Sequence, residues 1–210
     1  MIQTILQLLV DQLTDYIHEI STGVDDPPVV LGNIGMAENL GGTEAFTKGR
    51  VVLSLVNVME EGTLKNTSPY TKFNNGHEMS NPPTFLNLYL LFSSNFISSG
   101  NAGGEVEYFN GLTRLSQVIT FFQSKNVFTP QNSPLLSALG DEHMIDYKIR
   151  MELFSLTFEQ VNHLWGSLGG KQVPFVMYKA SILPLKRRRA TDRGEYIHDI
   201  HTTSIQIDQQ

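Results

Sequence analysis

The sequence predicts an α+β fold: a mixed, mainly antiparallel sheet with about three helices packed on it, plus an extended C-terminal arm. Strand-like runs follow one another along the chain, as 50–61 and 84–96 do, instead of alternating regularly with helices. Three other segments carry apolar residues at helical spacing. With 210 residues and 40% hydrophobic content, the chain can bury a substantial core. We therefore assign residues 1–185 to one domain and 186–210 to the arm.

The N-terminal half is predicted to contain one helix and three strands. The apolar residues of 2–20 recur every three or four positions, and a Pro-Pro pair a few residues later cannot continue that helix. A short apolar strand follows at 29–34. The run 50–61 is strongly β-branched with apolar residues on both faces, which is typical of a central strand. The alternating segment 84–96 is the third strand.

The segment that connects the second and third strands, 61–83, is polar and rich in turn-forming residues. Its Asn74-Asn75-Gly76 sequence is typical of a hairpin turn. We therefore expect a protruding loop or a small hairpin here.

The C-terminal half is predicted to contain two helices and two strands. The buried stripe of the helix 105–125 is expected to consist of Phe109, Leu112, Leu115, Ile119 and Phe122. The alternation in 145–156 predicts a strand with one buried face. Thr157 and Gln160 have the spacing of a capping box, which begins a second helix. Its apolar stripe comprises Phe158, Val161, Leu164, Trp165 and Leu168, and the strand 174–185 follows.

Residues that commonly carry out chemistry form no convincing group. The absence of Cys excludes disulfides, thiolate catalysis and Cys-based metal sites. The Gly169-Gly170-Lys171 sequence follows a helix, whereas a phosphate-binding loop follows a strand. An acidic cluster around His143 has metal-ligand composition, but a solvated loop explains it more simply. We predict no catalytic residue, no metal, no cofactor and no enzymatic activity.

Charge is distributed unevenly. The whole chain carries −6, with 10 Lys/Arg against 17 Asp/Glu in residues 1–185 and 5 against 4 in residues 186–210. An acidic body is expected to repel nucleic acid. The basic run 186–189 has the composition to bind phosphate, but solvated charge beside an arm is the simpler interpretation. No uncharged apolar run reaches membrane-spanning length and no secretory signal is evident, so we expect a soluble protein made in the cytoplasm, without nucleic-acid or membrane partners.

The tail contains the alternating, β-branched sequence TTSIQI at 202–207. Such a strand can complete an exposed sheet edge of a neighbouring subunit. Two simpler interpretations are a frayed terminus and a last strand on the chain's own sheet. The sequence does not decide among the three.

Four segments, taken together, resemble one protein family. They are VVLSLVNVMEEGTLKN, PPTFLNLYLLFSSNF, LSQVITFFQSKNVFTPQNSP and MELFSLTFEQVNHLWGSLGGKQVPFVMYKASIL. The chain from Ile2 to Leu185 resembles the cap, or tail-terminator, proteins of extracellular contractile injection systems of the antifeeding-prophage and virulence-cassette type. Two departures from the family pattern are expected: the loop 61–82 is interpreted as an insertion particular to this sequence, and the tail after Leu185 carries no matching motif.

The resemblance implies a structural role. Such a cap forms a six-fold ring on the distal end of the inner tube and the sheath, ends polymerisation and stabilises the extended particle. It is assembled in the cytoplasm and becomes part of the injection particle. The expected contacts with neighbouring or sheath subunits involve first Arg187, Arg188, Arg189, Ile205 and Ile207, and second the loop around Tyr70, Phe73 and His77. The alternatives are a phage tail-completion or connector protein and, in another class, a small hydrolase whose catalytic groups form no sequence motif.

Overall fold

The computed structural model describes residues 2–21, 27–36, 49–63, 70–73, 76–79, 84–96, 104–133, 148–169, 172–185 and 192–195. The helical elements are α1 (Ile2–Ile20), the 3-10 turn η1 (Ile34–Met36), α3 (Gly104–Ser124) and α4 (Phe158–Ser167). The strands are β1 (Val29–Leu31), β2 (Arg50–Glu60), β3 (Tyr70–Phe73), β4 (Gly76–Met79), β5 (Thr84–Asn95), β6 (Val127–Phe128), β7 (Lys148–Leu153), β8 (Phe175–Leu185) and β9 (Asp192–Glu195).

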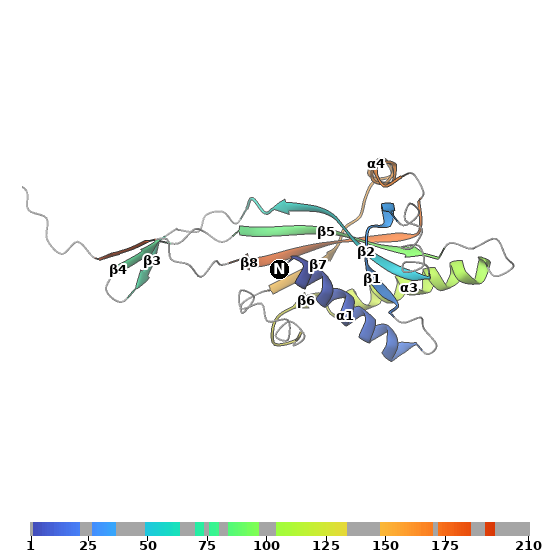
Figure 1. Ribbon diagram of the computed structural model, residues 1–210, viewed down its shortest axis with the longest axis horizontal. Helices are drawn as coiled ribbons and strands as arrows, with labels where there is room; N and C mark the ends of the chain where they lie inside the picture. The colour runs from blue at the N-terminus through green and yellow to red at the C-terminus, as the bar shows by residue number, and fades with distance from the viewer. Residues whose placement is uncertain are drawn as a thin grey trace, which may run out of the picture.

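Six of these strands form the main sheet in the order β1-β2-β5-β8-β7-β6. Only the β1–β2 pair is parallel, and the other four pairs are antiparallel. The predicted α+β class with a mixed, mainly antiparallel sheet is thereby confirmed. The remaining strands β3, β4 and β9 form a separate small sheet, which lies beyond the ends of β5 and β8 (Figure 1).

The helices α1 and α3 cover one face of the main sheet (Figure 1). The apolar stripe of α1 packs against alternate residues of β2, β5 and β8, because those residues point to the same face. Each buried Leu or Ile contributes roughly 1.5–3 kcal/mol to this core. The ring of Phe122 on α3 lies 5.4 Å from that of Phe92 and 4.7 Å from that of Tyr178. Fully buried members of the core include Ile5, Leu9, Leu13, Ile17, Leu53, Leu88, Leu90 and Phe128.

A smaller core lies on the opposite face, beneath α4 and η1. Trp165 is 4% exposed and its ring lies 5.4 Å from that of Phe175. Its buried neighbours in this core are Val30, Ile34, Val52, Leu91 and Met177. The predicted capping box begins α4 as expected: the Thr157 hydroxyl accepts from the Gln160 backbone, and the Gln160 side chain accepts from the Thr157 backbone. The stripe prediction for α4 is wrong for Phe158, which is 92% exposed at the first turn.

The stripe predicted for α3 is also partly wrong. Phe109, Leu112 and Ile119 are exposed. The close approach to the sheet begins at Gly111, where an added Cβ would lie 2.3 Å from Ser94 Oγ. The part of the helix before this glycine extends past the end of the sheet (Figure 1). The residues that α3 buries in the core are Leu115, Val118, Phe121 and Phe122.

Within the described residues, no helix has the length and apolarity needed to cross a membrane.

Candidate assembly interface

Within the residues that the structure describes, the outer edge of β2 is paired along less than half of its length. On its inner side, β2 pairs with β5 from Arg50 to Glu60. On its outer side, β1 pairs only with Val51, Val52 and Leu53. Among the described residues, no strand pairs with the outer side of Leu55–Met59, which we call the open edge. The prediction that 50–61 is a central strand is confirmed by the position of β2 between β1 and β5, but in the described part of the chain only the first part of β2 is paired on both sides.

Ser54 accounts for the point at which β1 leaves β2. The last contact of that side is the Gly32 N–H, which donates to the Leu53 carbonyl at 3.0 Å. The Ser54 hydroxyl then donates to the Gly32 carbonyl at 2.7 Å and accepts from the Ile34 N–H at 3.2 Å. These two bonds replace the next strand pairing and direct the chain into η1. The open edge begins at the next residue.

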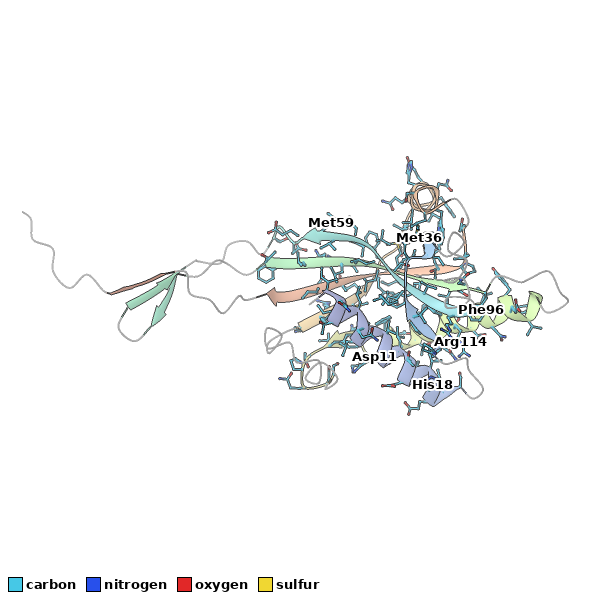
Figure 2. The ribbon with its side chains drawn as sticks, in the orientation of Figure 1. Asp11, His18, Met36, Met59, Phe96 and Arg114 are labelled. Atoms are coloured by element: carbon cyan, nitrogen blue, oxygen red, sulfur yellow. The ribbon has the colours of Figure 1, made fainter. Side chains whose placement is uncertain are left out.

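The open edge carries apolar side chains and no charge. Leu55, Val56, Val58 and Met59 are 37–48% exposed, and Met59 lies near the end of β2 (Figure 2). A register shift between Leu55 and Asn57 marks a bulge, and the Asn57 side chain accepts from the Val58 N–H at 2.8 Å. Edge strands usually carry charges or Pro that discourage pairing with other chains. Apart from the bulge, the open edge has no such protection, and it is suited to contact another chain.

The small sheet joins the two segments that the sequence predicts as interfaces. β3 and β4 form the predicted hairpin, with Phe73 opposite Gly76, while Asn74 and Asn75 lie outside the described residues. β9 comes from the arm and pairs antiparallel with β4, from Met79 opposite Asp192 to Gly76 opposite Glu195. The sequence did not predict this pairing, because Asp192–Glu195 contains no apolar residue.

The structure places only some of the predicted interface residues. Tyr70 and Phe73 lie at the two ends of β3, and His77 lies on β4 opposite Lys72, so the three belong to the same small sheet. Arg187, Arg188, Arg189, Ile205 and Ile207 lie outside the described residues.

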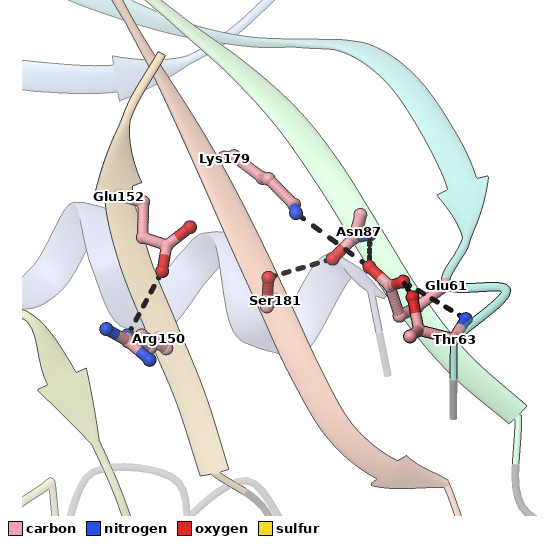
Figure 3. A network of polar contacts seen from close by, with 7 residues as sticks. All are labelled: Glu61, Thr63, Asn87, Arg150, Glu152, Lys179 and Ser181. Atoms are coloured by element: carbon pink, nitrogen blue, oxygen red, sulfur yellow. Dashed lines mark hydrogen bonds and ion pairs between the residues drawn. The ribbon is translucent and has the colours of Figure 1, made fainter.

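A polar network fixes the position where the chain leaves β2 for the small sheet (Figure 3). The Glu61 carboxylate accepts from the Thr63 hydroxyl at 2.6 Å and from Asn87 Nδ2 at 2.7 Å, and Lys179 Nζ lies 3.8 Å away. The Ser181 hydroxyl donates to Asn87 Oδ1 at 2.8 Å. The hydrogen bond from the Thr63 side chain, followed by that from Asn87, lowers the pKa of Glu61 to about 2. This network joins the end of β2 to β5 and β8.

The other residues with possible chemical roles form no site in the described part of the chain. In the described part of the chain, no three His, Asp or Glu side chains are grouped as metal ligands would be. Glu159 and His163, one turn apart on α4, form an exposed contact of 3.8 Å. His143, His198 and His201 lie outside the described residues. An open groove of about 540 Å³ borders α3, β7 and β8, and its charged residues, Arg150 and Glu152, pair with each other at 3.1 Å.

The main sheet and its covering helices form an α+β domain, and the open edge and the small sheet are its candidate surfaces for contact with other chains. A comparison with protein-family models matches residues 3–199 to the Pvc16 N-terminal domain. The chain belongs to this family, which confirms the resemblance found in the sequence. The match continues past Leu185 and includes β9, so the resemblance extends further than the sequence motifs indicated.

The comparison with solved structures gives two matches from contractile injection systems. The sheath/tube terminator of PVC, an extracellular contractile injection system, in its extended state has a TM-score of 0.53 and 11% identity, over 99% of this chain and 64% of that chain. The tube terminating cap of the anti-feeding prophage has a TM-score of 0.44 and 11% identity, over 74% of this chain and 49% of that chain. The chain thus spans less than two thirds of the length of either relative. A search of curated proteins gives no match.

Proposed function

We propose that this chain is a terminator of a contractile injection system, which caps the distal end of the tube and the sheath, ends polymerisation and stabilises the extended particle. The family match over residues 3–199 is the observation that carries this proposal. The similarity of the fold to the PVC sheath/tube terminator, over nearly the whole chain, agrees with it.

The surfaces of the domain suit a closed ring of copies, which we propose to have six-fold symmetry. A ring requires that one surface of a subunit binds a different surface of the next. The open edge of β2 and the small sheet are two different surfaces, located on the body and beyond it (Figure 1). The open edge presents exposed apolar side chains, and the outer strands of the small sheet, β3 and β9, present backbone edges, which pairing between chains can bury.

The contacts with neighbouring or sheath subunits are assigned to two regions. The first is the arm 186–210, with Arg187, Arg188, Arg189, Ile205 and Ile207, and the second is the hairpin region around Tyr70, Phe73 and His77. The pairing of β9 with β4 supports treating these regions as one unit. We propose in addition that residues 1–185 form the domain and residues 186–210 the arm.

The proposed role is non-enzymatic and requires no cofactor. Its partners are further copies, the inner tube and the sheath, and its place is in the particle after assembly in the cytoplasm. Neither the family match nor the fold match favours a phage tail-completion protein or a small hydrolase.

Deletion of the gene in cells that produce the particle tests the proposal. We expect particles with uncontrolled tube length or prematurely contracted sheaths, as seen by electron microscopy, and we expect the full chain supplied from a plasmid to restore uniform particles. Particles of normal length with extended sheaths in the deletion strain would overturn the proposal.

A matched pair of truncations tests the arm. A chain that ends at 201 retains β9, and a chain that ends at 185 lacks it. We expect both to lose capping, because both lack Ile205 and Ile207. Normal capping by the chain ending at 185 would refute the arm assignment.

A further inference from the structure

We propose that the tail segment Thr202–Ile207 of one copy pairs, as an added strand, with the open edge of β2 in a neighbouring copy. This inference rests on the proposed function, because it names the contact that joins successive copies of the ring.

The acceptor is a strand with backbone groups directed away from its own sheet. The Val51 N–H donates outward to the Pro28 carbonyl, and the Leu53 carbonyl accepts from Gly32 on the same side. Because alternate residues direct their backbone groups to the same edge, those of Leu55 also point outward. Past the bulge the Val58 N–H points outward as well, since it donates to the Asn57 side chain rather than to β5. A local side chain is an easily exchanged partner, so an incoming carbonyl can replace it.

The donor has the composition that this acceptor requires. Residues 202–207 contain no charge and alternate between Thr203, Ile205 and Ile207 on one face and polar residues on the other. The open edge, Leu55–Met59, also contains no charge and has a similar length. Pairing of the two leaves no charged side chain between the strands. In addition, the family match ends at residue 199, so this segment lies outside the matched domain.

The register of the small sheet favours a neighbouring copy over the chain's own edge. Glu195, the last residue of β9, lies opposite Gly76 at the turn end of the hairpin. The tail therefore starts at the turn end of the hairpin, whereas the chain that comes from β2 enters the hairpin at its other end, at Tyr70. The six residues 196–201 span at most roughly 20 Å, and retracing the four residues of β9 alone uses roughly 13 Å.

The small sheet lies well beyond the main sheet (Figure 1), and residues 61–69 separate it from β2 along the chain. A tail that turned back toward Met59 of the same chain would have only roughly 7 Å left to cross this separation, which favours a neighbouring copy. A tail that starts at this position meets the next copy instead. Because the donor and the acceptor are different surfaces, the contact is heterologous and can close into a ring.

Cross-linking tests the pairing without interference, because the natural chain has no Cys. Full-length Val58→Cys and Ile205→Cys variants are purified separately, mixed under conditions of assembly and treated with a short bis-maleimide. We expect a covalent dimer as the main product of the mixture and only background from either variant alone. Phe109→Cys mixed with Ile205→Cys is the matched control, because Phe109 is an apolar residue on α3, away from the open edge, and is more exposed (58%) than Val58 (40%).

Three results would overturn the inference: no dimer from the mixture, an equal yield from the Phe109 control, or a Val58→Cys/Ile205→Cys double variant that cross-links only within one chain. As an independent measure, Val58→Lys places a charge on the open edge. We expect it to shift the protein from assembled to single chains in size-exclusion chromatography with light scattering, with an unchanged melting temperature, whereas Phe109→Lys leaves assembly intact.

The outcomes separate this inference from the proposed function. If the cysteine variants cap particles normally and no cross-link forms, the strand pairing is wrong and the terminator role stands. If the cross-link forms and the deletion strain still makes uniform particles, the pairing stands and the terminator role is wrong.

Discussion

Replacing Ser54 by Ala removes the side chain that directs the chain from β1 into η1. The Gly32 carbonyl loses a donor at 2.7 Å and the Ile34 N–H loses its acceptor at 3.2 Å. A buried polar group without a partner costs about 1–3 kcal/mol. The Ile34 bond is buried and that of Gly32 is partly buried, so we expect Ser54→Ala to lower the free energy of unfolding by about 2–4 kcal/mol.

Ser93→Ala is the matched control for this prediction. Ser93 is a fully buried serine on the neighbouring strand β5, and its hydroxyl donates only one long bond, 3.3 Å, to the Val52 carbonyl. Val52 and Ser93 are paired in the β2–β5 ladder, so we expect a loss of about 1 kcal/mol or less. Urea denaturation followed by circular dichroism measures both values. A Ser54→Ala loss that equals the Ser93→Ala loss would refute the role given to Ser54.

Three further changes probe other parts of the structure. The pKa of Glu61 is lowered from its ordinary value of 4.5 to about 2 in the folded protein, so its stabilising contribution is complete above pH 4.5 and is lost as the pH falls toward 2. Over this range the melting temperature of Glu61→Gln should therefore fall less steeply with decreasing pH than that of the natural protein. Equal slopes would contradict the network. Trp165→Ala should lower the free energy of unfolding by about 3–5 kcal/mol. Trp165→Phe should lower it clearly less, because the indole N–H has no hydrogen-bond partner in the described structure. Equal losses of the two variants in urea unfolding would show that this interpretation is wrong. Phe158→Ser should change stability by no more than about 0.5 kcal/mol, since the side chain is 92% exposed; a larger loss by the same assay would mean that Phe158 packs in the monomer.

The local signals in the sequence predicted the elements well. The capping box at Thr157 and Gln160 acts over three residues, and the alternation of β5 acts over two. Such short-range patterns depend little on the rest of the chain. For this reason the α+β class and the positions of α1, α4, β5 and β8 could be predicted before the structure.

The failures all concern contacts between segments far apart in the sequence. Phe109 has correct helical spacing for burial, but it is 58% exposed and precedes Gly111, where α3 meets the end of β5 at Ser94. The apolar run in β2 is typical of a central strand, yet β1 pairs with only three residues of β2 before Ser54 bonds to Gly32 and the pairing ends. Asp192–Glu195 has no strand-like pattern in the sequence, and β9 nevertheless pairs with β4. The candidate interface consists mainly of these features, so the sequence indicated its segments and not its geometry.

The small sheet joins two segments that are far apart in the sequence, the hairpin between β2 and β5 and the segment after β8. Its middle strand, β4, pairs with β3 on one side and with β9 on the other. An isolated two-stranded hairpin is at best marginally stable in water. Relatives in which natural insertion or deletion has altered the length of the hairpin should therefore show a matching change in the segment corresponding to β9. Grafting the hairpin alone onto another member of the family should fail to reproduce its shape unless that segment is transferred with it.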